Sequence, residues 1–257
     1  MNKLITLLLT LLTLGWSQEH WETAIYDNDI WSYYPAVAEP PADWMNPDFD
    51  DTAWLQGTGG IGFGDNDDGT IISGVSAVYI RTTFSIPSLD QITAGLLHYD
   101  YDDGFIAYLN GQEIFRSPNM GTPGSFVAFD EGMILGHEAN MYRDQLPGMK
   151  QIGGDLLPAL IHTGENILAV HVQNISASSS DLTGRFWLSF NIMDASTMFG
   201  EVPEWFFSPQ PFTSLLPLVL IDTEGQTIPD EPKIHSMMRV IDNGPGMENN
   251  ITDPSTG

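Results

Sequence analysis

Short apolar stretches separated by polar turns recur along most of the chain. Residues 77–86, 166–172 and 185–192 are rich in β-branched and aromatic side chains, with turn residues near both ends of each stretch. Runs of this length and composition are typical of β-strands, whereas helical periodicity is confined to one short turn at residues 155–161. The pattern predicts an all-β fold, an antiparallel β-sandwich.

One hairpin is predicted with particular clarity. Residues 105–109 and 112–115 are apolar runs that flank Asn110 and Gly111. Asn-Gly between two such runs is a strong hairpin signal, because both residues tolerate a positive φ angle. Residues 95–99 predict a further strand shortly before it.

The hydrophobic run at the N-terminus has a different character. Lys3 makes the start positive, residues 4–14 are apolar apart from threonines, and residues 15–17 place small residues where a signal peptidase reads. This layout is that of a secretory signal peptide over residues 1–17. The run is too short to span a bilayer, so we expect a secreted or cell-surface protein without a membrane span.

The charge balance narrows the choice of partners. The 257 residues include 34 Asp and Glu but only 8 Lys and Arg, a formal net charge of −26. Such a field repels phosphate backbones and disfavours nucleic acid as a partner. The chain has no cysteine, which excludes disulfides and thiol catalysis. Its oligomeric state is not determined by composition.

Changes in composition divide the mature chain into three parts. Residues 18–195 carry the strand pattern, residues 196–214 are rich in Pro, Gly and aromatic residues and predict a linker, and residues 215–257 contain two further strand-like runs. A hairpin alone is marginally stable in water, so we interpret the third part as the incomplete start of a second domain. The aromatic residues 205–207 are expected to pack on a neighbouring surface.

Four motifs resemble those of the galactose-binding-like jelly-roll domains, which accompany many glycoside hydrolases. They follow the family's order: FDDxxW at residues 49–54, YxRxxF at residues 79–84, DDGxxxYLNG at residues 102–111 and the strand with Gly-Glu-Asn-Ile-Leu-Ala-Val at residues 160–170. The resemblance implies a jelly-roll β-sandwich. Domains of this kind bind carbohydrate or serve for adhesion or as spacers.

The third part has a resemblance of its own. Residues 218–233 resemble the entry segment of the spore-coat CotH kinase-like family, which often follows such a sandwich in secreted bacterial proteins. The family's kinase chemistry would lie beyond Gly257, so no catalytic residue is assigned and the chain is interpreted as a fragment. Two functions stay open. One is a non-catalytic secreted module whose partner is a glycan or cell-surface polysaccharide; the other is the accessory N-terminal part of an atypical extracytoplasmic protein kinase.

Two acidic turns share the pattern D-x-D-D-G, at residues 65–69 and 100–104. Closely spaced carboxylates before a glycine can surround one Ca²⁺ ion with oxygen atoms. The alternative is ordinary turn chemistry, for which Asp-Gly is common. The candidate ligands of a structural calcium ion are Asp65, Asp67, Asp68, Asp102 and Asp103.

Aromatic and polar side chains are also available for a sugar. Sugars present apolar faces that rest on aromatic rings, and hydroxyl groups that bond to carboxylates, amides or arginine. The candidate carbohydrate-binding residues are Trp31, Tyr34 and Trp44, taken as loop aromatics, with Arg116, Asn174 and Asp181. The alternative is that these aromatics are core or loop-packing residues of a spacer.

Residues 57–62 match the G-x-G-x-x-G pattern of phosphate-binding loops. The acidic residues that follow would repel phosphate, and no helix is predicted after the glycines. We interpret this segment as a flexible Gly-rich loop.

Overall fold

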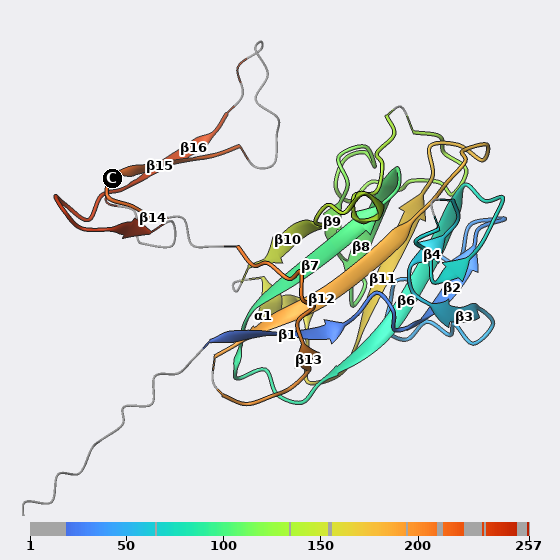
Figure 1. The fold of residues 1–257 in the computed structure, drawn as a ribbon, viewed down its shortest axis with the longest axis horizontal. Coiled ribbons are helices and arrows are strands. Elements are labelled where there is room, and N and C mark those ends of the chain that lie inside the picture. Colours follow the sequence, from blue (N-terminus) through green and yellow to red (C-terminus); the bar gives the residue numbers. More distant parts are fainter. Residues whose placement is uncertain are drawn as a thin grey trace, which may run out of the picture. The chain divides into compact units, whose positions relative to one another are not determined.

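In the computed structural model of the chain, the regular secondary structure consists almost entirely of β-strands (Figure 1). The chain divides into two compact units after Phe206. The residues that the structure describes are 19–64, 66–133, 135–153, 156–193, 195–209, 213–223, 233, 235–250 and 256. The predicted signal peptide over residues 1–17 lies outside them. Within the described part, no helix is long and apolar enough to cross a membrane.

The first unit is a sandwich of two sheets. The six-stranded sheet has the order β3 (Leu55–Thr58), β2 (Ile30–Pro35), β6 (Ala77–Ile86), β11 (Gly164–Gln173), β8 (Gly104–Leu109), β9 (Gln112–Arg116). The five-stranded sheet has the order β10 (Gly148–Ile152), β7 (Ile92–Tyr101), β12 (Gly184–Ile192), β1 (His20–Ile25), β13 (Gly200–Glu201). All neighbouring strands within both sheets are antiparallel. The prediction of an antiparallel β-sandwich is confirmed.

Side chains alternate between the core and the outer faces, as the pleat of a strand requires. On β6, Val78 and Ile80 are buried in the core between the sheets, whereas Ala77 and Tyr79 lie on the outer face of the six-stranded sheet. The core itself is aliphatic and aromatic, and Phe105 is among its fully buried side chains. Each such side chain contributes about 1.5–3 kcal/mol through removal from water.

Several strands agree closely with their prediction. β6 has the predicted bounds, and β8 and β9 form the predicted hairpin, with φ angles of 50° at Asn110 and 83° at Gly111. The short helix α1 (Leu157–Leu160) lies within the predicted helical turn. Strands β1, β2, β3 and β10 were not predicted from the sequence.

The glycines of residues 57–62 serve close packing. They lie in β3, in the bend at residues 59–60 and in β4 (Ile61–Gly62), which pairs in parallel with β5 (Thr70–Ile71). A Cβ atom at Gly59 would collide with the carbonyl oxygen of Asp27, and one at Gly62 with the carbonyl oxygen of Leu182. The interpretation of this segment as a flexible loop is therefore wrong: glycine is required because backbone approaches backbone.

The second unit contains two small antiparallel pairs. They are β14 (Thr213–Ser214) with β17 (Asn249–Asn250), and β15 (Leu218–Asp222) with β16 (Met237–Ile241). Leu218 and Ile241, which face each other in the register, are buried. Residues 224–232, between β15 and β16, lie outside the described residues, and the resemblance of this part to the CotH family stays a prediction.

Candidate functional site

The outer face of the six-stranded sheet is covered by irregular chain instead of another layer of regular structure. Residues 36–54, between β2 and β3, pack on that face through Trp44, and residues 126–131 lie over β11. The latter belong to the long connection between β9 and β10, whose described residues form no regular element except the 3-10 turn η1 (Met141–Arg143). Long connections of this kind in compact domains are often functional.

Arg81 on β6 fastens residues 36–54 to the sheet. The residue is 2% exposed, and its guanidinium donates hydrogen bonds to the carbonyl oxygens of Asn46 (2.9 Å) and Phe49 (3.2 Å) and pairs with the carboxylate of Asp51 (3.1 Å). A buried charge requires such partners. The FDDxxW and YxRxxF motifs therefore contact each other through Arg81, which attaches residues 36–54 to the sheet.

Between residues 36–54 and the sheet lies a hollow of about 210 Å³, which we name the sheet-face pocket. The rings of Trp44, Tyr79, Tyr108 and Phe126 line it. Trp44 stands edge-on to Tyr79 and Tyr108, with ring centroids 4.9 and 5.6 Å apart. Phe126 is 75% exposed, whereas Trp44 and Tyr79 are buried. The pocket thus combines a rigid aromatic interior with one freely accessible ring.

Glu39 is an exposed residue that also lines the sheet-face pocket. Its Oε2 accepts a hydrogen bond from the Tyr79 hydroxyl (3.2 Å), and its Oε1 accepts one from the backbone N–H of Phe129 (2.8 Å). Burial, and secondarily the nearby Glu39 carboxylate, raises the pKa of Tyr79. The Tyr79 hydroxyl therefore stays protonated and donates to Glu39 at neutral pH.

His171 completes the polar lining. Its ring stacks on Tyr79 with centroids 4.4 Å apart, and its Nε2 lies 2.8 Å from the Gln173 side-chain oxygen. Burial lowers the pKa of His171 to about 4, against the opposing effect of the hydrogen bond to Gln173. The imidazole is therefore neutral at pH 7 and brings no positive charge to the pocket.

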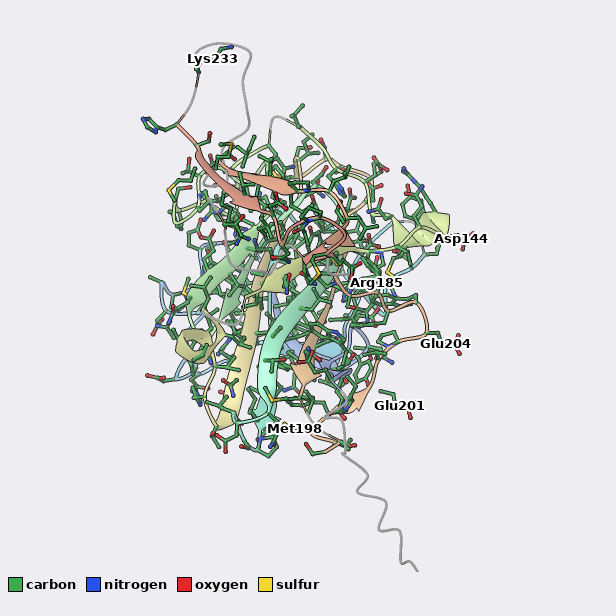
Figure 2. The ribbon with its side chains drawn as sticks, turned by 90° about the vertical axis from the view of Figure 1, so that its left-hand side faces the viewer. Asp144, Arg185, Met198, Glu201, Glu204 and Lys233 are labelled. Atoms are coloured by element: carbon green, nitrogen blue, oxygen red, sulfur yellow. The ribbon has the colours of Figure 1, made fainter. Side chains whose placement is uncertain are left out.

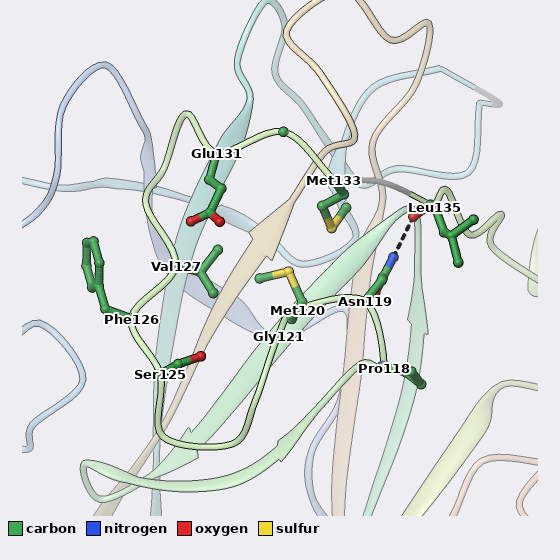
Figure 3. Close-up of a pocket in the computed structure, with 11 residues that line it drawn as sticks. Pro118, Asn119, Met120, Gly121, Ser125, Phe126, Val127, Glu131, Met133 and Leu135 are labelled. Atoms are coloured by element: carbon green, nitrogen blue, oxygen red, sulfur yellow. Dashed lines mark hydrogen bonds between the residues drawn. The ribbon is translucent and has the colours of Figure 1, made fainter. Parts of the chain in front are cut away.

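A second hollow of about 430 Å³ lies within the long connection itself, and we name it the loop pocket (Figure 3). Phe126 and Val127 line both pockets. The loop pocket is otherwise built mainly of Met, Leu and Pro side chains, with Asn119, Ser125 and Glu131 as its polar groups. Its walls resemble a flexible apolar cleft more than an aromatic platform.

Arg116 at the end of β9 holds the loop that carries Phe126. Its guanidinium forms a bidentate pair with Glu113, both N–O distances being 2.7 Å, and donates to the carbonyl oxygens of Met120 (2.6 Å) and Ser125 (2.9 Å). Arg116 is buried and lines neither pocket. It positions the loop, a different role from the sugar contact predicted for it.

The structure separates the three predicted aromatic residues. Trp31 and Tyr34 lie on β2, and the placement of both in a loop is wrong. Trp31 belongs to the core between the sheets and lines neither pocket, so it is not placed to contact a sugar there. Tyr34 packs behind the pocket against Tyr79, at a centroid distance of 6.4 Å. Trp44 alone among them lines the sheet-face pocket.

The remaining two predicted sugar contacts lie in the connection between β11 and β12. Asn174 is fully buried, and its side-chain amide donates to the carbonyl oxygen of Asp181 (2.8 Å). The Asp181 carboxylate accepts hydrogen bonds from the hydroxyl groups of Ser179 and Ser180, both 3.2 Å. These contacts close the connection on itself, and neither residue lines either pocket.

The two acidic turns contain further buried carboxylates. Both carboxylate oxygens of Asp67 are buried without a hydrogen-bond partner, and the Thr183 hydroxyl lies 3.4 Å from an oxygen of Asp68. Asp103 accepts backbone N–H bonds from His137 (3.1 Å) and Ile175 (2.6 Å). Asp65 lies outside the described residues.

Among the residues that the structure does describe, no group of three or more His, Asp and Glu side chains is arranged to hold one metal ion. Calcium at either turn stays a prediction.

Asp102 is the most strongly perturbed of these carboxyls. It is 5% exposed, and burial, followed by the charges of Asp103, Asp181 and Glu138, raises its pKa to about 8. Burial likewise raises the pKa of Asp100, against the hydrogen bonds that it accepts from two backbone N–H groups. The turn that joins β7 to β8, and hence one sheet to the other, is thus held partly protonated near neutral pH.

Five residues that line the sheet-face pocket were not predicted as site residues: Glu39, Tyr79, Tyr108, Phe126 and His171. Tyr79 and Tyr108 each lie within a recognised motif, so their outward direction follows once the strand register is known. Glu39 and Phe126 lie in irregular segments whose path depends on contacts distant in sequence.

Some charged residues elsewhere on the first unit are paired with an opposite charge, and others are exposed to solvent. Arg185 on β12 pairs with Asp27 at 2.6 Å, and Glu201 and Glu204 are exposed (Figure 2). Exposed acids of this kind account for solubility without implying a site.

No protein-family model and no curated protein matches the chain. Among solved structures, it is similar to β-glucuronidase 2 of Bacteroides uniformis covalently bound to cyclophellitol-6-carboxylate aziridine, with 15% identity, a TM-score of 0.43, and coverage of 91% of this chain and 27% of that chain. A β-glucuronidase from glycoside hydrolase family 2 gives 14% identity, a TM-score of 0.42, and coverage of 98% and 28%. The Bifidobacterium dentium β-glucuronidase complexed with coumarin-3-O-glucuronide gives 20% identity, a TM-score of 0.37, and coverage of 60% and 20%. The chain spans less than a third of each of these proteins, and no activity is carried over from them.

Proposed function

We propose that the sandwich is a non-catalytic carbohydrate-binding module whose sugar occupies the sheet-face pocket. The observation that carries this proposal is the combination of four aromatic rings with the exposed carboxylate of Glu39 around one hollow. Flat rings suit the apolar faces of a pyranose, and a carboxylate accepts hydrogen bonds from its hydroxyl groups. The pocket of about 210 Å³ is smaller than most drug-sized sites, which suits a single sugar ring.

The choice of the sheet-face pocket over the loop pocket rests on side-chain shape. Met120 and Met133 in the loop pocket are flexible and present no flat surface. Trp44 and Tyr79 hold each other in an edge-to-face arrangement against the sheet, so the wall of the pocket loses little conformational entropy when a ligand enters it.

The test is a binding measurement with matched variants. The full chain is titrated by calorimetry against a panel of soluble oligosaccharides. We expect Phe126→Ala to weaken the best ligand about tenfold, with an unchanged thermal midpoint because this side chain is exposed. Leu135→Ala is the matched control: Leu135 is 69% exposed and lines the loop pocket only.

Three results would count against the proposal. Binding to no member of the panel removes the carbohydrate function. Unchanged affinity in Phe126→Ala removes the assigned pocket. A loss in Leu135→Ala as large as that in Phe126→Ala places the sugar in the loop pocket instead.

We further propose that this module is exported, a proposal supported by the sequence of residues 1–17 alone. Expression in a bacterial host with a functional secretion pathway should yield a mature protein that begins at Gln18. Mass spectrometry of the exported product checks the cleavage position, and retention of the full-length chain in the cytoplasm contradicts it.

A further inference from the structure

The lining of the sheet-face pocket is unbalanced in charge. Of the eleven described residues that line it, Glu39 is the one acidic residue, and none is Lys or Arg. His171 is neutral there, as its burial requires. A ligand in this pocket therefore meets a negative charge without a compensating positive one.

The nearest guanidinium groups cannot supply that compensation. Arg116 is buried and forms its bidentate pair with Glu113, and Arg81 is buried and pairs with Asp51. Both guanidinium groups also donate hydrogen bonds to backbone carbonyl oxygens. Turning either group toward a ligand would therefore break the bonds that hold the irregular segment it contacts. The net charge of −26 adds a long-range field of the same sign as Glu39.

The Glu39 carboxylate retains hydrogen-bonding capacity. An ionised carboxylate offers about four acceptor sites. Two are used, one by the Tyr79 hydroxyl and one by the Phe129 N–H. The remaining sites can accept from an ammonium group, and a charge-assisted hydrogen bond of this kind is stronger than a neutral one.

On these grounds, and resting on the proposed function, we propose that the sheet-face pocket selects a sugar with a free amino group, which bonds to Glu39, and rejects uronic acids. A glucosamine-type unit brings an ammonium group to the carboxylate. A glucuronate-type unit brings a second carboxylate, which has no cation to pair with. This selectivity is opposite in charge to the glucuronides named for the similar solved structures.

The experiment compares three β-1,4-linked disaccharides that differ in charge: glucosamine, glucose and glucuronate units. Titrations are made at pH 6, where the amine is protonated and the carboxylates are ionised, and at about 0.15 M salt, which screens distant charges. We expect the glucosamine form to bind roughly tenfold more tightly than the glucose form, and the glucuronate form about tenfold more weakly.

Two variants separate local from long-range charge. Glu39→Gln should reduce the preference for the glucosamine form over the glucose form to less than about twofold, because a neutral amide cannot form the charge-assisted hydrogen bond to the ammonium group. Glu165→Gln makes the same charge change at the exposed start of β11, roughly 20 Å along the strand from His171. It should leave the preference intact.

The outcomes distinguish the inference from the function beneath it. If none of the three disaccharides nor any panel member binds, the proposed function and this inference fail together. If the disaccharides bind equally, or if Glu165→Gln removes the preference as Glu39→Gln does, the function stands and the inference is overturned.

Discussion

The outer faces of the two sheets carry similar aromatic residues but are covered differently. On the five-stranded sheet, Trp187 and His98 pack against Trp205, with ring centroids 4.9 and 5.2 Å apart, and Trp21 packs against Phe206 at 5.8 Å. These aromatics are satisfied by the chain's own residues 205 and 206, as the sequence analysis expected. On the six-stranded sheet, residues 36–54 leave the sheet-face pocket open.

Aromatic residues on the outer face of a sheet can therefore be covered by the chain itself, and only an incomplete cover leaves room for a ligand. A buried charged side chain holds an irregular segment to each sheet, but on the five-stranded sheet that segment is residues 198 and 199, which pack against the core between the sheets. Arg81 donates to the backbone of residues 46 and 49, whereas Glu22 on β1 accepts the backbone N–H groups of Met198 and Phe199, both at 2.7 Å. The two groups of hydrogen bonds depend on side chains of opposite charge, Arg81 and Glu22. Substitution of one residue can therefore disrupt one group without the other.

Arg81→Met should have the largest effect. It leaves two carbonyl oxygens and the Asp51 carboxylate without their partner, and we expect a loss of about 3 kcal/mol in unfolding free energy, together with sugar binding. Urea unfolding and calorimetric titration measure the two. The control is Arg143→Met, since the Arg143–Glu138 pair is exposed to solvent and should contribute little to stability. Equal stability of the two variants would refute the fastening.

Glu22→Ala should destabilise by about 2 kcal/mol, because two N–H groups lose their acceptor, but should leave sugar binding unchanged. Glu22→Gln keeps one oxygen and should recover most of the loss. Burial opposes ionisation of Glu22, but the hydrogen bonds from Phe199 and Met198 outweigh it and lower its pKa. Its contribution is therefore present above the usual glutamate pKa and is lost as pH falls, which acid titration of both variants checks. A loss of sugar affinity in Glu22→Ala would contradict the claim that Glu22 stabilises the fold without affecting the sheet-face pocket.

Asp102→Asn tests the turn that joins the two sheets. Because the pKa of Asp102 is raised to about 8, the folded state holds a proton that the unfolded state loses near pH 4. Its favourable contribution is complete below pH 4 and disappears as pH rises through 8. In the presence of a chelator, the unfolding free energy of the variant should match that of the wild type at pH 4 and exceed it at pH 8. A stability difference independent of pH would contradict the shifted pKa.

The fold was largely predictable from local sequence. β6 and the β8–β9 hairpin could be located because their apolar runs are long and bounded by turn residues. β1 and β2 were missed because polar and aromatic residues alternate there without a continuous apolar run. The Arg81 fastening explains why two of the recognised motifs occur together.

The candidate site was much less predictable. Trp31 and Tyr34 are three positions apart, an odd number, so one strand must direct them to opposite faces. Recognising β2 would have assigned Trp31 to the core. No local pattern could bring Glu39 and Phe126 together, because their meeting depends on Arg81 and Arg116 holding two irregular segments over the sheet.

The most direct test of the central claim is a titration of the best-binding sugar into ¹⁵N-labelled protein, followed through the tryptophan indole N–H signals. If the sugar occupies the sheet-face pocket, the Trp44 signal shifts progressively as sugar is added, whereas the signals of Trp187 and Trp205 do not change. A shift confined to Trp187 or Trp205, or no shift of the Trp44 signal at saturating sugar, would contradict it.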